Sequence, residues 1–358
     1  MDYQDYLQQV APLAEQELQK IYPEAHVEIR EVQKYNHSYT GLVPILPFEG
    51  EMLAPCLDLT QIYETSGAWK QDGIVEQAPA ELIGMMVTGI EKAKDHRESL
   101  EIFIGDDFDR VRSNLGVVVR GIAGNEDYLK GRPYDRMGDL AVLYTMHVTV
   151  GGDRGMVVIT NDMMRHYGIN HEQLREAALV NAVVQRPPAM TGIMNAIDSL
   201  RGDPSSEFSG GIPETAPMSE SLFTVSCLRE HGLSDNGAGV IAYPGLFDQI
   251  RSSLGEDFCI LPSSIHEVLV VRDSMAREIG VEQLEDLVKT VNETQVDPRE
   301  QLSDHVYHYD GEERKFELIR DYTARNRSWE TLSENGPVRE EPTKGMDRHP
   351  RLDYDPNR

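Results

Sequence analysis

Apolar residues recur every three to four positions in several stretches of the chain, which is the pattern of helices with one buried face. The first two stretches cover residues 1–21 and 80–96. Three more cover residues 161–168, 170–183 and 244–254. Asn170 stands before a long run of helix-forming residues, where an asparagine side chain commonly caps the first turn. We therefore predict at least four amphipathic helices spread along the chain.

Between the helices, alternating apolar and polar residues indicate strands that pair as hairpins. Residues 26–46 and residues 139–160 each read as two strands joined by a turn. Residues 222–230 and 238–243 are predicted as a third hairpin, because Asn236-Gly237 favours a tight turn between strands. Helices follow the second and third hairpins. The chain is therefore predicted to be an α+β protein of repeated β-hairpin-plus-helix units, with mainly antiparallel sheets and packed helices.

Changes in composition divide the chain into regions. We expect an N-terminal α+β region over residues 1–130, a middle hairpin-helix unit over residues 131–200 and a C-terminal hairpin-helix unit over residues 221–320. Residues 201–220 are rich in glycine, proline and serine and show no periodicity, so they are predicted to form a flexible loop. Residues 321–358 mix charges with prolines and are predicted to be a disordered tail.

The formal charge of −27 is the strongest signal in the composition. Fifty of the 61 acidic residues and 24 of the 34 basic residues precede residue 311, so that part of the chain carries a charge of −26. Such a surface repels phosphate backbones and therefore disfavours direct nucleic-acid binding. The charge either keeps the protein in solution or attracts the basic surface of a partner.

The chain has no apolar run of the roughly 18 residues that a membrane helix needs, and its first residues lack the features of a secretion signal. We expect a cytoplasmic protein without a membrane span. Cys56, Cys227 and Cys259 are odd in number and lack metal-binding spacing, so they are predicted to be reduced. No cofactor and no metal site are expected from the sequence.

Two motifs carry a resemblance to a known family. These are PSSIHE, at residues 262–267, and NETQVDP, at residues 292–298. With the flanking segments, most of residues 1–320 resembles an uncharacterised family, classified as a domain of unknown function, that is found in gut Clostridia and related Firmicutes. The resemblance implies no known activity. It implies that such genes often lie on integrative or conjugative elements.

A serine nucleophile is the first candidate for chemistry. Ser263 or Ser264 would attack a substrate, and His266 would act as the base across the turn. The glycine-flanked elbow that exposes such a serine is missing. The alternative is that both hydroxyl groups bind backbone groups in a tight turn. Glu267 points away from His266 if this segment is a regular strand, so the two are not expected to share a metal ion.

A histidine pair is the second candidate. His305 lies on a predicted strand, and it would meet His266 in one pocket with carboxylates for acid–base work or metal binding. The alternative is a hydrogen-bonded network that holds strand, helix and loop together. The residues expected in such a binding or structural network are Glu267, Asn292, Glu293, Asp297 and Asp304.

Three functions remain open at this point. The first is a non-enzymatic, cytoplasmic protein that binds another protein and regulates or maintains a mobile genetic element; the acidic body and Trp329, the one large apolar residue of the tail, favour it. The second is a hydrolase that uses Ser263, Ser264, His266 and His305. The third is an acidic DNA mimic that occupies the nucleic-acid site of a basic protein. We give preference to the first because no complete catalytic signature is found.

Overall fold

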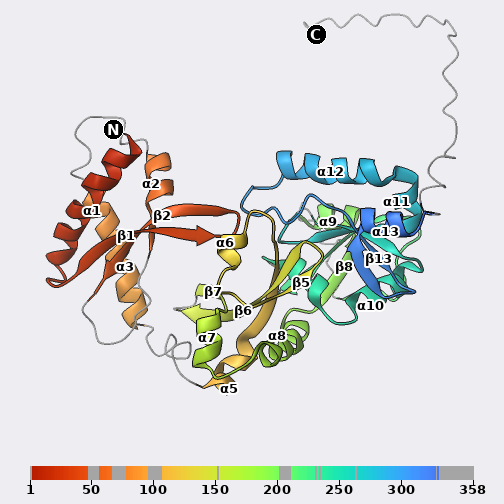
Figure 1. The fold of residues 1–358 in the computed structure, drawn as a ribbon, viewed down its shortest axis with the longest axis horizontal. Helices are drawn as coiled ribbons and strands as arrows, with labels where there is room; N and C mark the ends of the chain where they lie inside the picture. The colour runs from red at the N-terminus through yellow and green to blue at the C-terminus, as the bar shows by residue number, and fades with distance from the viewer. Residues whose placement is uncertain are drawn as a thin grey trace, which may run out of the picture.

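The computed structural model describes most of the chain as three antiparallel sheets with packed helices (Figure 1). The predicted α+β class is confirmed. The described residues are 2–46, 56–66, 78–95, 107–150, 153–200, 211–229, 232–233, 235–262, 264–327 and 329. In this part of the chain, no helix is long and apolar enough to cross a membrane.

The first sheet belongs to an N-terminal unit with its own hydrophobic core. Its strands lie in the order β1-β2-β3, and three helices pack with them. Tyr6, Leu18, Leu42 and Ile90 are among the buried residues of this core. The elements are α1 (Tyr3–Gln19), β1 (His26–Lys34), β2 (His37–Ile45), β3 (Leu57–Asp58), α2 (Leu59–Ser66) and α3 (Ala78–Asp95).

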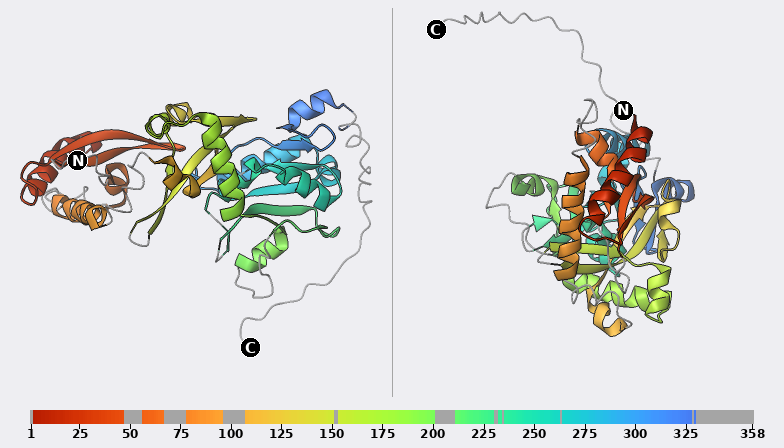
Figure 2. Two further views of the ribbon diagram at one scale, coloured as in Figure 1. Left: turned by 90° about the horizontal axis from the view of Figure 1, so that it is seen from below. Right: turned by 90° about the vertical axis from the view of Figure 1, so that its left-hand side faces the viewer.

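The hairpin of β1 and β2 forms an arm that reaches the rest of the molecule (Figures 1 and 2). At its tip, the Tyr35 hydroxyl group donates to the carbonyl oxygen of Gln301 at 2.6 Å. The neighbouring Asn36 exchanges two hydrogen bonds with Asn125, each 2.8 Å long. The arm is therefore fixed at its tip by specific polar contacts.

The second sheet is built around the long strand β6, which pairs with β4 on one side and with β5 and β7 along the other. Helix α8 packs on β4 and β6. The elements are α5 (Phe108–Val111), η2 (Arg112–Asn114), β4 (Leu115–Gly121), α6 (Glu126–Leu129), β5 (Tyr134–Met137), β6 (Leu140–Val150), β7 (Asp153–Val158), α7 (Asn161–His166) and α8 (His171–Gln185).

The third sheet has seven strands, in the order β10-β9-β12-β11-β13-β14 with β8 also on β9. Its strands are β8 (Pro188–Gly192), β9 (Leu222–Arg229), β10 (Gly232–Leu233), β11 (Phe258–Leu261), β12 (Val268–Arg272), β13 (Tyr307–Asp310) and β14 (Lys315–Leu318). Its helices are α9 (Ile193–Leu200), η3 (Gly237–Ala242), α10 (Leu246–Leu254), α11 (Asp273–Ile279), α12 (Val281–Thr294) and α13 (Ile319–Arg325).

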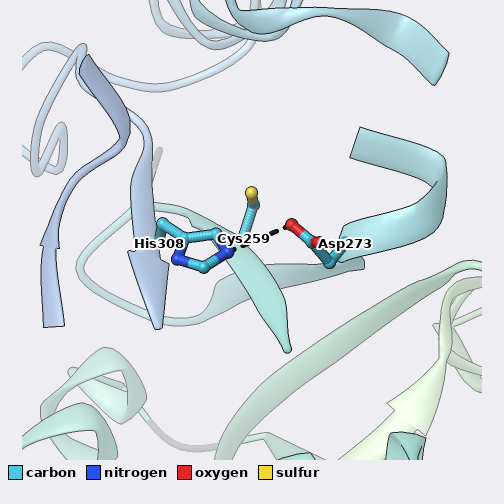
Figure 3. A group of neighbouring side chains, drawn as sticks. All are labelled: Cys259, Asp273 and His308. Atoms are coloured by element: carbon cyan, nitrogen blue, oxygen red, sulfur yellow. Dashed lines mark hydrogen bonds and ion pairs between the residues drawn. The ribbon is translucent and has the colours of Figure 1, made fainter. Parts of the chain in front are cut away.

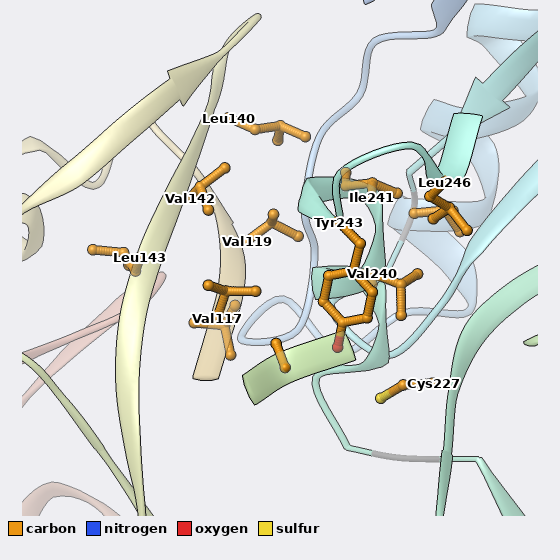
Figure 4. Close-up of a cluster of buried hydrophobic side chains, with 14 of the residues drawn as sticks. Val117, Val119, Leu140, Val142, Leu143, Cys227, Val240, Ile241, Tyr243 and Leu246 are labelled. Carbon is orange, nitrogen blue, oxygen red and sulfur yellow. The ribbon is translucent and has the colours of Figure 1, made fainter. Parts of the chain in front are cut away.

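The second and third sheets share one hydrophobic core (Figure 4). Val117 and Val119 of β4 face Val240 and Ile241 of η3 across it. Residue 130, the expected end of the N-terminal region, lies between β4 and β6, and both strands contribute to this core. The N-terminal unit has a separate core, and a third core packs α11 and α12 against the other face of the third sheet.

The predicted strand over residues 238–243 is wrong, because the chain forms the 3-10 helix η3 there. Asn236 adopts a left-handed conformation with φ of 61° and turns the chain into η3. Gly239 then lies so close to β4 that a Cβ atom would be 2.8 Å from the carbonyl oxygen of Val117. Burial of Val240 and Ile241 against β4 outweighs the local preference of this apolar run for a strand.

The chain beyond residue 320 is partly built into the body. Helix α13 continues to Arg325, and Trp329 is buried in a core formed with α11, α12 and the third sheet. The expected tail of residues 321–358 thus contains a helical turn and a buried anchor at its start. Residues 330–358 of that range and residues 201–210 of the expected loop at 201–220 lie outside the described residues.

Candidate functional site

Ser264 and His266 lie in a turn that is held by their own side chains. The hydroxyl group of the buried Ser264 accepts the backbone amide of His266 at 3.0 Å. Nδ1 of the His266 ring accepts a hydrogen bond from the backbone amide of Asn236 at 3.3 Å. Nε2 of the same ring lies 3.3 Å from the carboxylate of Glu300. These groups fasten the turn to neighbouring loops. The other serine, Ser263, lies outside the described residues.

Asn292 fastens the end of α12 to the loop that follows it. Its side chain is only 2% exposed, and its amide group donates to the carbonyl oxygen of Ser303 at 3.1 Å and to Asp304 Oδ1 at 2.7 Å. The backbone oxygen of Asn292 accepts the side-chain amide of Gln301 at 2.7 Å. Asn292 therefore sets the position of the loop with both its side chain and its backbone.

The remaining residues of the expected network, Glu267, Glu293 and Asp297, differ in burial. Asp297 accepts the backbone amide of Arg299 at 2.9 Å and pairs with its side chain, and these hydrogen bonds lower the pKa of Asp297 to about 2. Burial raises the pKa of Glu267 above its usual value. Glu293 is exposed on the last turn of α12.

Asp139 contacts three side chains of the C-terminal unit, although it lies in the turn between β5 and β6 of the second sheet. Its Oδ2 is 2.7 Å from Nδ1 of His305 and accepts the Ser303 hydroxyl group at 3.1 Å. Its Oδ1 accepts the hydroxyl group of Tyr307. Burial, together with the charge of Asp139, raises the pKa of Tyr307, so this hydroxyl group stays protonated and donates.

The Asp139 group borders an open polar cavity of about 510 Å³, here called the Asp139 cavity. His305, whose side chain is 50% exposed, lines it, and so do Asn292 and Asp304. The arm tip contributes Asn36, and the end of β4 with the loop before α6 contributes residues 121–125. Three of the expected site residues thus share one cavity, whereas the lining does not include His266. In this cavity the partner of His305 is Asp139.

Chemically, the Asp139–His305 pair resembles an oriented base. A neutral His305 that donates its Nδ1 proton to Asp139 has a lone pair at Nε2, which accepts a proton or a hydrogen bond. Sequence reasoning missed Asp139 because it lies 166 positions before its partner. The only local signal was an acidic residue directly after Gly138 in a turn.

A second polar group is buried inside the C-terminal unit (Figure 3). Cys259, Asp273 and His308 offer ligand atoms that lie within 4.8 Å of one another, and all three are buried. One carboxylate oxygen of Asp273 accepts two hydrogen bonds, from Nε2 of His308 at 3.0 Å and from the indole N–H of Trp329 at 2.6 Å. Its other oxygen accepts Arg277 at 2.7 Å.

The types of these three residues are those that bind transition metals. Two observations favour a hydrogen-bonded network instead. Burial raises the pKa of the Cys259 thiol well above its usual value, which disfavours the thiolate that metals require. The guanidinium group of Arg277 already supplies positive charge to Asp273. The group therefore anchors Trp329, and with it the start of the C-terminal segment, to the third sheet.

An exposed apolar row runs along α8, here called the valine row and made of Val180, Val183 and Val184. Val180 is 62% exposed and Val184 is 76% exposed. Leu174, Ala178 and Ala182, on the opposite face of the helix, are buried. In Figure 2, left, α8 lies in front of the two sheets, and its outer face is turned to the viewer without another described helix or strand over it.

Together, the fold and these sites define an α+β protein with an exposed apolar helix face and a polar cavity at the tip of its arm. Residues 3–311 match the model of a family of unknown function, DUF5688, and the chain belongs to this family. The expected membership in an uncharacterised family is confirmed. No curated protein and no solved structure matches the chain.

Proposed function

We propose that this chain is a non-enzymatic protein that binds another protein through the valine row of α8. The observation that carries the proposal is the exposure of three valines on adjacent turns of one helix. Single exposed apolar residues are common, but contiguous apolar groups mark interaction sites. Residues three and four positions apart on a helix are neighbours, so the three side chains form one surface.

The charges around the row indicate the chemistry of the partner. Glu172 and Glu176 are exposed on the same helix, whereas Arg175 pairs with Asp135 at 3.1 Å. The surface is thus an apolar row with an acidic border, on a chain of formal charge −27. Its complement is an apolar patch bordered by lysine or arginine. We further propose that this binding regulates a mobile genetic element. Only the sequence resemblance supports this part of the proposal.

Replacing Val180 and Val184 with Asp is expected to abolish binding of the partner, because the charged groups would have to be desolvated at the interface. The test is affinity capture with the full chain, followed by calorimetric titration of the captured protein. Ile29→Asp is the matched control, since Ile29 is an exposed apolar residue on β1 in the N-terminal unit. A partner that binds the wild type, the control and the double variant equally well contradicts the proposal.

Acid–base catalysis at His305 is a second candidate, favoured by the 2.7 Å contact with Asp139 beside an open cavity. His305 would take a proton from water as the water attacks an ester carbonyl carbon and would return it to the departing alcohol. Hydrolysis of a nitrophenyl ester by the purified chain is then expected to fall by about 10²-fold in His305→Ala. His26→Ala, at an exposed histidine of β1, is the control. Equal rates in both variants, or none in the wild type, contradict this candidate.

A further inference from the structure

We propose that the Asp139 cavity binds a primary ammonium or a guanidinium group. This inference depends neither on the valine row nor on any catalysis by His305. It rests on acceptor atoms of the lining residues that can still take a hydrogen bond from a ligand. Its volume of about 510 Å³ lies in the range of small-molecule sites.

Asn292 provides the first observation. It lines the cavity and is almost fully buried, and the two hydrogen bonds that its amide nitrogen donates fix which end of the amide is oxygen. Its Oδ1 has no hydrogen-bond partner among the described residues. A buried acceptor without a donor costs about 1–3 kcal/mol. Because this oxygen is itself covered in the structure, a ligand that donates N–H groups removes the cost only when the Asn292 side chain turns toward the cavity.

The other lining groups also favour a donor. Asp139 and Asp304 bring two carboxylates, and the only fully charged basic side chain of the lining is Lys289, which is exposed on α12. Asp304 uses Oδ1 to accept Asn292, so its other oxygen can accept from a ligand. A neutral His305 that donates to Asp139 adds a further acceptor.

Acceptors from three elements thus border one cavity. A cationic group with several N–H donors fits them, because it supplies both the hydrogen bonds and the opposite charge. An anion would meet the carboxylates of Asp139 and Asp304 and is disfavoured. The cation has two possible sources, a free small amine or a lysine or arginine side chain of a partner.

The experiment is a titration of the full chain with butylammonium, a linear diamine and lysine or arginine blocked at both backbone ends, followed by calorimetry. Butanol, of similar size, is the neutral control ligand. Tighter binding of the diamine than of the blocked amino acids points to a free amine, and the reverse order points to a partner side chain. Binding of any cation but not of butanol supports the proposal.

Asp304→Asn is expected to weaken the binding about fivefold, the scale of a partly exposed charge pair. The asparagine keeps an oxygen for Asn292, so folding should be preserved, and thermal denaturation checks this. Asp286→Asn removes a charge from the exposed face of the same helix α12 and should leave the affinity unchanged. Equal affinity in both variants, or no binding of any cation at millimolar concentration, overturns the proposal and leaves water as the occupant.

Discussion

Replacing Asp273 with Ala is expected to lower the free energy of unfolding by about 3–5 kcal/mol, the cost of removing one partner from a buried charged group. Asp273 accepts His308, Trp329 and Arg277, and the variant leaves all three donors without their acceptor. His308 and Trp329 are buried, so water cannot replace the carboxylate. Urea denaturation followed by circular dichroism measures the loss.

The control is Asp286→Asn on the exposed face of α12, which should change the stability by less than about 0.5 kcal/mol. Burial alone would raise the pKa of Asp273, but hydrogen bonds from His308 and Trp329 outweigh it and lower that pKa. Its contribution is therefore fully present above about pH 4, the unfolded value, and is lost as the pH falls through the folded pKa. An Asp273→Ala variant as stable as the control at neutral pH would refute the anchoring role.

Replacing Gly239 with Ala is expected to cost about 2 kcal/mol, because the added carbon overfills a packed interior. The new Cβ atom would lie 2.8 Å from the carbonyl oxygen of Val117 and 3.2 Å from the Cα atom of Val118. Both are backbone atoms of β4, so neither can turn aside as a side chain does. The same denaturation experiment measures the effect.

Gly84→Ala is the matched control for this substitution. Gly84 is exposed within α3, and a Cβ atom there would meet nothing within 4 Å. In a helix, alanine is favoured over glycine by about 1 kcal/mol, so this variant should be slightly more stable. If both variants changed the stability in the same direction by the same amount, the close contact between η3 and β4 would not explain the effect at Gly239.

Much of the fold follows from local sequence. Residues 26–46 and 139–160 form the predicted antiparallel hairpins, because alternation of apolar residues determines which strand face is buried. Asn170 caps α8 as predicted, with Gln173 completing a reciprocal pair of hydrogen bonds. These features depend on residues that are close in the chain, which is why the sequence alone indicates them.

The segment Ala238–Tyr243 shows where local sequence is insufficient. Its apolar run suits a strand, but the contact with Val117 that selects η3 comes from a strand about 120 positions earlier. The Asp139–His305 pair has the same origin, since two distant segments meet only after the sheets pack. Contacts between distant segments therefore determine both the 3-10 helix at this segment and the partner of His305, and neither contact can be read from the local sequence.

The candidate residues in the PSSIHE motif illustrate a different limit. Ser264 and His266 have the chemical types of a nucleophile and a base, yet their hydrogen bonds run to the turn and to the Asn236 loop. Residue type reveals what a side chain can do, whereas its hydrogen-bond partners reveal what it does in the fold. The valine row was visible as an apolar pattern on α8, but only the exposure of each side chain distinguishes it from the core.

Hydrogen exchange of the full chain, with and without the captured partner protein, tests the proposed binding surface most directly. If the partner covers the valine row, the backbone amides of α8 will exchange more slowly in the complex, and those of β1 will exchange at the same rate as in the free chain. Slower exchange confined to other elements, with α8 unchanged, would contradict the assignment of this helix as the binding face.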